Sequence, residues 1–132
     1  MRDILALRRF LDDEVSDTQT YSRMAWEARG TDAEPIFLRA AADERRHARR
    51  LMTEHFILTG DTYAPTPKRG DETSLLASIR DRYIEERGGA AAYENAAGET
   101  EKPRLAAIYM EFSKDERRHA AAMLALIERL MM

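Results

Sequence analysis

The hexapeptide DERRHA occurs twice in this sequence, at residues 43–48 and at residues 115–120. In each copy a Glu precedes a His by three residues, so both side chains lie on one face of a helix. Around the first copy, that same face carries apolar residues such as Phe37 and Leu51. The Glu and the His of each copy are therefore expected to point into a helical core, whereas the first Arg of each copy points to solvent.

Four stretches have the composition and the three-and-four spacing of amphipathic helices. Pro35 and Pro103 suit first helical turns, and Gly98 suits a helix end. The Pro- and Gly-rich stretch between the second and third helices predicts an extended linker. The expected fold class is all-α, a single domain that forms a four-helix bundle with a long crossover between helices two and three. The expected helices are at about residues 3–29, 32–59, 73–97 and 100–131, with the linker at about 60–72 and the domain over residues 1–132.

Each predicted helix carries one inward-facing stripe with a carboxylate near its middle. In the third helix, Glu85 competes with Glu86 for the inward position, and the stripe favours Glu86. In the fourth helix, the stripe continues to Leu130. No run of inward Lys or Arg accompanies the carboxylates. The predicted stripe of the third helix is Leu76, Ile79, Tyr83, Glu86, Ala90, Tyr93 and Ala97.

The two halves of the chain repeat with an offset of 72 residues (115 minus 43). The offset keeps the ligand-type residues in register beyond the hexapeptide itself. It predicts a bundle with pseudo-twofold symmetry, in which the four carboxylates and the two imidazoles meet at mid-bundle. The matched pairs are Glu14 and Glu86, Tyr21 and Tyr93, Glu44 and Glu116, and His47 and His119.

Four buried carboxylates without counter-charges would each cost several kcal/mol. Two divalent cations would neutralise them, and oxygen ligands with one imidazole per ion suit iron or manganese. We therefore expect two metal ions bridged by Glu44 and Glu116. A metal-free polar layer that sets the register of the helices is the alternative reading. The predicted metal ligands are Glu14, Glu44, His47, Glu86, Glu116 and His119.

These features together resemble the ferritin-like di-iron carboxylate proteins, and the rubrerythrin group in particular, over nearly the whole chain. The resemblance rests on two Glu-x-x-His motifs, each preceded by a Glu at the same spacing of 30 residues (44 minus 14 and 116 minus 86). A Tyr follows each upstream Glu by seven residues. The resemblance implies that Tyr21 and Tyr93 hydrogen-bond near the metals, although both could be ordinary core aromatics.

The hexapeptide also resembles the DExRH motif of carboxylate-bridged di-iron oxygenases. That resemblance implies that Asp43 and Asp115 orient the ligand His residues through their distal nitrogens. Arg46 and Arg118 would then stand behind the two Asp residues. The alternative for both Asp residues is a surface carboxylate.

The sequence departs from the rubrerythrin pattern in two ways. Gly88 and Gly89 occupy the turn where rubrerythrins carry a further third-helix Glu, and the chain has no Cys for a rubredoxin site. The resemblance implies a ferroxidase that oxidises bound Fe(II) with O2 or H2O2. The alternatives are a rubrerythrin-type peroxidase, a di-iron hydroxylase and a non-catalytic iron-binding protein. Reducing equivalents would come from Fe(II) itself or from a separate electron donor.

Charge and hydropathy narrow the expected partners. The 132 residues carry a formal net charge of −3, which favours neither nucleic acid nor an anionic membrane surface. No apolar run approaches the roughly 18 residues of a membrane span, and the charged N-terminal stretch is unlike a secretion signal. We expect a cytoplasmic protein. Outward apolar residues, including Trp26, predict a homo-oligomer, most simply a dimer, in which exchange of helix pairs between chains is an alternative.

Overall fold

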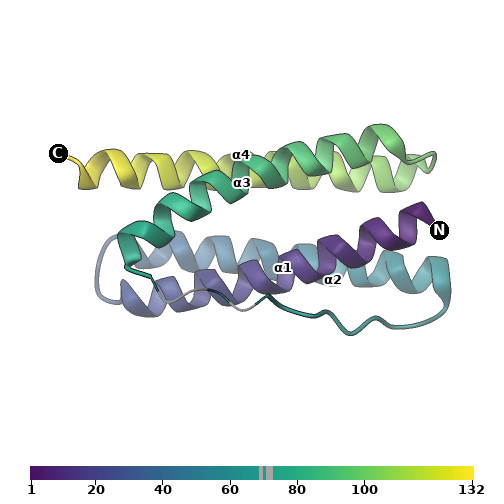
Figure 1. Cartoon of the computed structure of the whole chain (residues 1–132), viewed down its shortest axis with the longest axis horizontal. Helices are drawn as coiled ribbons and strands as arrows, with labels where there is room; N and C mark the ends of the chain where they lie inside the picture. Colours follow the sequence, from purple (N-terminus) through teal and green to yellow (C-terminus); the bar gives the residue numbers. More distant parts are fainter. Residues whose placement is uncertain (69, 71–72) are drawn as a thin grey trace. The chain divides into compact units, whose positions relative to one another are not determined.

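The computed structural model describes residues 1–68, 70 and 73–132, and in these residues it contains four α-helices and no strand (Figure 1). The prediction of an all-α chain is confirmed. The helix boundaries differ from the predicted ones by at most three residues, the largest difference being at the start of the fourth helix. The helices are α1 (Arg2–Glu27), α2 (Glu34–Thr59), α3 (Leu75–Glu99) and α4 (Pro103–Leu130).

Local residue chemistry explains where the helices begin and end. Pro35 and Pro103 lie in first turns, where the missing N–H costs no hydrogen bond. Gly60 ends α2 with a φ of 76°, a left-handed conformation that favours glycine. The Ser74 side chain caps α3 by accepting a hydrogen bond from the Ala77 N–H. The prediction that Gly98 stops the third helix is wrong, because α3 continues to Glu99 before Thr100 turns extended.

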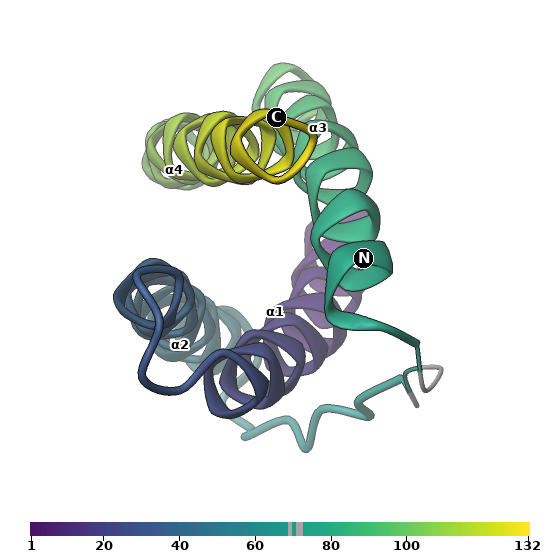
Figure 2. The same cartoon turned by 90° about the vertical axis from the view of Figure 1, so that its left-hand side faces the viewer.

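The chain divides into two compact units, Met1–Glu72 and Thr73–Met132. In the first unit α1 packs on α2, and in the second α3 packs on α4 (Figure 2). Both pairs are antiparallel. In the first, Glu14 meets His47 while the earlier Arg8 meets the later His55. In the second unit, the contacts of Glu86 with His119 and of Glu94 with Arg117 show the same direction.

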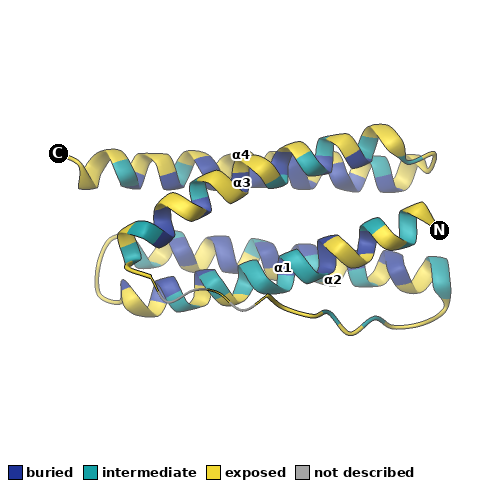
Figure 3. Cartoon of the chain, viewed as in Figure 1, coloured by how far each residue is buried: buried dark blue, intermediate teal, exposed yellow. Residues whose placement is uncertain are grey.

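A buried stripe runs along each helix (Figure 3). The predicted stripe of α3 is partly wrong: Leu76 is 43% exposed and Tyr83 is half-buried, whereas Ser78 and Arg82 are buried. Counted back from Glu86 in steps of the helical period of 3.6 residues, the inward positions lie near residues 82 and 79. The inward face therefore contains Arg82, one residue before the predicted Tyr83. On α4 the stripe ends at Leu126, because Leu130 in the last turn is exposed.

Residues 61–68 form an irregular segment that follows α1, and we call it the strap (Figure 1). Asp12 of α1 accepts hydrogen bonds from the Tyr63 hydroxyl and from the Thr66 backbone N–H. Further along, the Lys68 N–H donates to the Ser16 hydroxyl. The strap therefore runs back along its own helix pair, as an extended linker predicts. The predicted linker also includes residues 69, 71 and 72, which lie outside the described residues.

Within the described ranges, none of the helices combines the length and the apolar character that a membrane crossing requires.

Candidate metal centre

The first unit brings three predicted ligands together, and we call this group the first triad: Glu14 of α1 with Glu44 and His47 of α2. All three side chains are buried. The His47 Nδ1 lies 3.1 Å from the Glu14 Oε2 and 3.6 Å from the Glu44 Oε1. The spacing of three residues within α2 puts Glu44 and His47 on one face, and the antiparallel packing of α1 brings Glu14 to the same level.

The second unit repeats this arrangement in the second triad: Glu86 of α3 with Glu116 and His119 of α4. Its members are likewise buried. The His119 Nδ1 lies 2.8 Å from the Glu86 Oε2 and 3.5 Å from the Glu116 Oε2. In both triads, the Nδ1 atom faces the carboxylates, so the Nε2 atom is the one left for a positioning hydrogen bond.

Burial decides the proton affinity of Glu86. Removal from water, together with a hydrogen bond to Glu116, raises the pKa of Glu86 well above its ordinary value, and the neighbouring His119 acts in the opposite direction. In the metal-free protein the second triad therefore keeps a proton on this carboxyl to a higher pH than an exposed Glu would. A bound cation would favour the ionised form.

The donor set of each triad fits a divalent cation. In each, one ligand atom from every member lies within 4.8 Å of the others. Metal–oxygen and metal–nitrogen bonds are about 2.0–2.2 Å, so the donors of one ion are typically about 3–4.4 Å apart. Two carboxylates and one imidazole are hard and intermediate ligands, a combination suited to iron or manganese. Small side-chain movements would bring each set onto one ion.

The two Asp residues of the hexapeptides pair with Arg residues, but they differ in burial. The Asp43 Oδ1 lies 3.5 Å from an Arg46 nitrogen, and its side chain is 22% exposed. Asp115 is paired with Arg118 and is 7% exposed. The implied arrangement of an Arg behind each Asp is therefore present within each helix, and the orientation of a His by each Asp stays a prediction.

The two predicted Tyr residues are core residues in their own units. Tyr21 is fully buried on α1. Tyr93 packs against the rings of Tyr109 and Phe112 of α4, with centroids 5.8 Å and 5.6 Å away. These contacts suit an aromatic core, and the implied hydrogen bonding of Tyr21 and Tyr93 near a metal stays a prediction.

Glu85 and His55 both have clear positions in the structure. Glu85 is exposed, whereas its neighbour Glu86 is 1% exposed. His55, which belongs to neither Glu-x-x-His motif, is fully buried outside the triads. Its Nε2 accepts a hydrogen bond from Arg8 and its Nδ1 lies 3.1 Å from the Asp61 carbonyl oxygen, so it connects α1 to the start of the strap.

Arg82 is the residue that sequence reasoning missed. The sequence shows no run of inward Lys or Arg, and this single Arg was not noticed. The Arg82 side chain is 7% exposed, and its Nη1 lies 3.8 Å from the Glu86 Oε1. Its position four residues before Glu86 is the signal that could have revealed it, because such residues share a helix face. Gly89, near the same site, would bring a Cβ to 3.9 Å from the Glu116 Cγ, which is ordinary contact.

Comparisons with known proteins inform the fold alone. No family model and no curated protein matches this chain. Among solved structures, a hypothetical protein from Pyrococcus furiosus is similar, with a TM-score of 0.87 and 15% sequence identity, over 98% of this chain and 90% of the other. This likeness confirms the predicted fold class, an all-α four-helix bundle with a long crossover between the second and third helices.

Proposed function

We propose that this protein binds two Fe(II) ions through its two triads and oxidises them with O2 or H2O2, in cytoplasmic iron handling. The observation that carries the proposal is the repeated donor set, two buried carboxylates and one imidazole Nδ1 in each unit. Iron and manganese are the metals that such a set prefers. On this proposal the chain is a ferritin-like carboxylate protein of the rubrerythrin group without a rubredoxin domain.

Iron supplies the redox chemistry, since each Fe(II) gives up one electron. With two protons, the two electrons reduce H2O2 to two water molecules, or O2 to H2O2, and leave two Fe(III). The side chains of the triads supply charge and position. Glu86, whose pKa is raised by burial, holds a proton in the metal-free protein and releases it when a cation binds.

The test begins with metal-free protein under anaerobic conditions. Fe(II) is titrated and counted by calorimetry, and O2 or H2O2 is then added while Fe(III) formation is followed by stopped-flow absorbance. We expect two Fe(II) per chain and faster oxidation than for Fe(II) in buffer. Absence of Fe(II) binding would contradict the proposal, and binding without faster oxidation would leave an iron carrier instead.

A matched pair of variants on α2 ties the result to the triads. Glu44 and Glu54 are both buried carboxylates of the same helix, but only Glu44 belongs to a triad. We expect Glu44→Gln to bind fewer than two Fe(II) ions per chain and to lose oxidation, whereas Glu54→Gln retains two ions per chain. Equal losses in the two variants would point to general destabilisation.

The same assay separates the alternative activities. A rubrerythrin-type peroxidase would turn over H2O2 repeatedly once a separate electron donor is present, whereas a ferroxidase stops when its Fe(II) is consumed. A hydroxylase would need an organic substrate to be consumed with O2.

Metal analysis of protein purified without added metal decides between iron and manganese. Magnetic exchange coupling between the two ions of the loaded protein tests bridging by Glu44 and Glu116.

A further inference from the structure

The two triads differ at one nearby position. The offset of 72 residues that relates the triads also relates Phe10 of α1 to Arg82 of α3. Each lies one helical turn before the first Glu of its triad. Both side chains are buried, with residue exposures of 3% for Phe10 and 5% for Arg82. At equivalent positions, the first unit thus has an apolar ring and the second has a cation.

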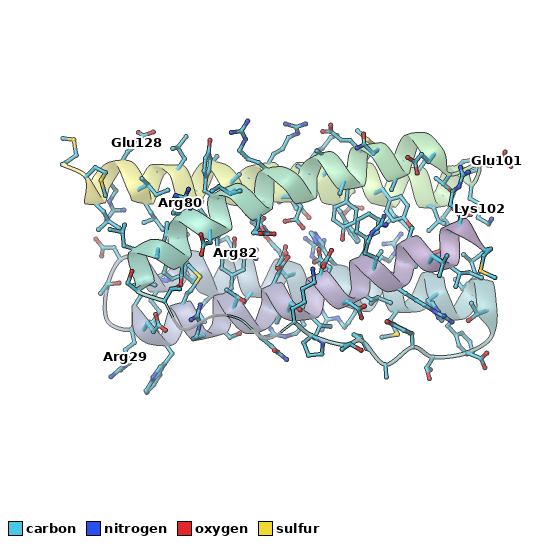
Figure 4. All side chains as sticks on the ribbon, in the orientation of Figure 1. Arg29, Arg80, Arg82, Glu101, Lys102 and Glu128 are labelled. Carbon is cyan, nitrogen blue, oxygen red and sulfur yellow. The ribbon has the colours of Figure 1, made fainter. Side chains whose placement is uncertain are left out.

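Arg82 is close enough to act on the second triad. Its Nη1 lies 3.8 Å from the Glu86 Oε1, and both side chains are almost fully removed from solvent. A guanidinium stays charged at any pH that a protein tolerates. Arg80, also labelled in Figure 4, is two residues away on the same helix but is 70% exposed. Arg80 therefore offers a control with the same charge and without the burial.

The charges of the triads with their neighbours are unequal. In the metal-bound state, with both carboxylates ionised and the His neutral, the side chains of each triad carry two negative charges. Arg82 reduces the sum at the second triad to one, and Phe10 leaves the first unchanged. The attraction for a divalent cation is therefore weaker at the second triad, and burial makes the difference larger than it would be in water.

We propose that Arg82 makes metal loading ordered: the first ion binds the Glu14–Glu44–His47 triad, and the Glu86–Glu116–His119 triad binds the second ion more weakly. This inference rests on the proposed binding of divalent cations by the triads. Arg82 is a positioning residue in this scheme, because it acts through the charge of Glu86. The chain would then hold one ion at low metal concentration and two only when metal is abundant.

The test uses Co(II), which binds similar ligands and reports on its coordination through visible absorption. We expect the full-length wild-type protein to bind two Co(II) ions in two steps whose dissociation constants differ by about tenfold or more. His47→Ala should remove the tighter step, and His119→Ala should remove the weaker one. These assignments need no substitution at Arg82.

Substitution of Arg82 then tests whether its charge is the reason that the second triad binds its ion more weakly. Arg82→Met should tighten the weaker step by about tenfold and leave the tighter step in place. Arg82→Lys, which keeps a charge, should keep the step weak, and Arg80→Met should change neither constant. A merely structural role for Arg82 would lower stability without moving one constant selectively.

Three results would overturn the inference while leaving the proposed function intact. The first is a wild type that binds two Co(II) ions with equal dissociation constants. The second is loss of the tighter binding step in His119→Ala rather than in His47→Ala. The third is a folded Arg82→Met protein in which the dissociation constant of the weaker step is unchanged. If that variant does not fold, Arg82→Lys and the His variants still decide the order. Absence of any Co(II) or Fe(II) binding by the wild type would overturn the proposed function as well.

Discussion

At the scale of single residues, His47 is the most informative ligand to remove. It lies fully buried between the carboxylates of Glu14 and Glu44. We expect His47→Ala to lose the metal ion of the first triad and Fe(II) oxidation together. The variant should also be less stable by about 3–5 kcal/mol, since buried carboxylates lose a partner. Metal content by elemental analysis and chemical unfolding would measure the two effects.

His55 provides the control for His47, because it is an equally buried His on the same helix. His55→Ala removes hydrogen bonds to Arg8 and to the strap, so it should lower stability while the protein keeps its metal. A His47→Ala protein that retains full metal and activity would show that the ligand assignment is wrong.

The raised pKa of Glu86 predicts how the stability of the metal-free protein depends on pH. Its folded-state pKa is raised well above the ordinary 4.5, so the folded protein keeps a proton that the unfolded chain releases. This contribution to stability is full below pH 4.5 and is lost as the pH rises through the raised folded value. In chelator, urea unfolding should therefore show Glu86→Gln losing less stability than wild type as the pH rises above 4.5.

Glu85→Gln is the matched control for that measurement, because Glu85 is the exposed neighbour of Glu86. Its pH dependence should follow that of the wild type. If Glu86→Gln also followed the wild type, burial of Glu86 would not be the cause of the pH dependence.

At the scale of the helices, Gly88 in α3 is a site for stabilisation. It lies inside the helix, and a Cβ added there would meet nothing within 4 Å. Gly88→Ala should raise the free energy of unfolding by about 0.5–1 kcal/mol, because alanine loses less backbone entropy on folding. Gly60→Ala should instead lower it by roughly 1–2 kcal/mol, since its φ of 76° is left-handed although its surroundings are open. Thermal unfolding of both variants would test the contrast.

The helices also show how far sequence reasoning reaches. Glycines, prolines and three-and-four spacing predict four helices to within three residues, because these signals act locally. The predicted inward face of α3 is one residue off at Leu76 and Tyr83. Both residues are apolar or aromatic and were therefore assigned to the core, whereas the position next to Tyr83 that is buried holds Arg82. A buried Arg runs against the hydrophobic pattern, and only its distance to Glu86 reveals it.

At the scale of the whole molecule, Asp12 joins the strap to α1. It accepts hydrogen bonds from the Tyr63 hydroxyl at 3.0 Å and from the Thr66 N–H at 2.8 Å. Asp12→Ala should lower stability by about 1–2 kcal/mol and speed hydrogen exchange at the Thr66 amide. The neighbouring Asp13 lies 3.6 Å from the exposed Lys68 ammonium, so Asp13→Ala should leave that amide protected. Equal exchange in both variants would contradict the role of Asp12.

Assembly is the second prediction at this scale. We expect a homodimer in solution, because several apolar side chains are exposed. They include Leu5, Trp26, Leu76 and Ile84. Light scattering measures the mass. If helix pairs exchange between chains, co-refolding His47→Ala with His119→Ala chains should restore two-ion binding in part, since some sites would receive both intact triads. A monomer that keeps its metal would exclude exchange.

Proteolysis of the strap can measure how often this segment detaches from α1. Residues 64–68 are exposed for the most part, and Lys68 is a cleavage point for trypsin. A protease must draw several residues into an extended conformation, and here the backbone N–H groups of Thr66 and Lys68 are held by Asp12 and Ser16. Nicking at Lys68 therefore requires the strap to detach first. The rate of limited proteolysis at this point would measure how often the segment leaves α1 while the helices remain folded.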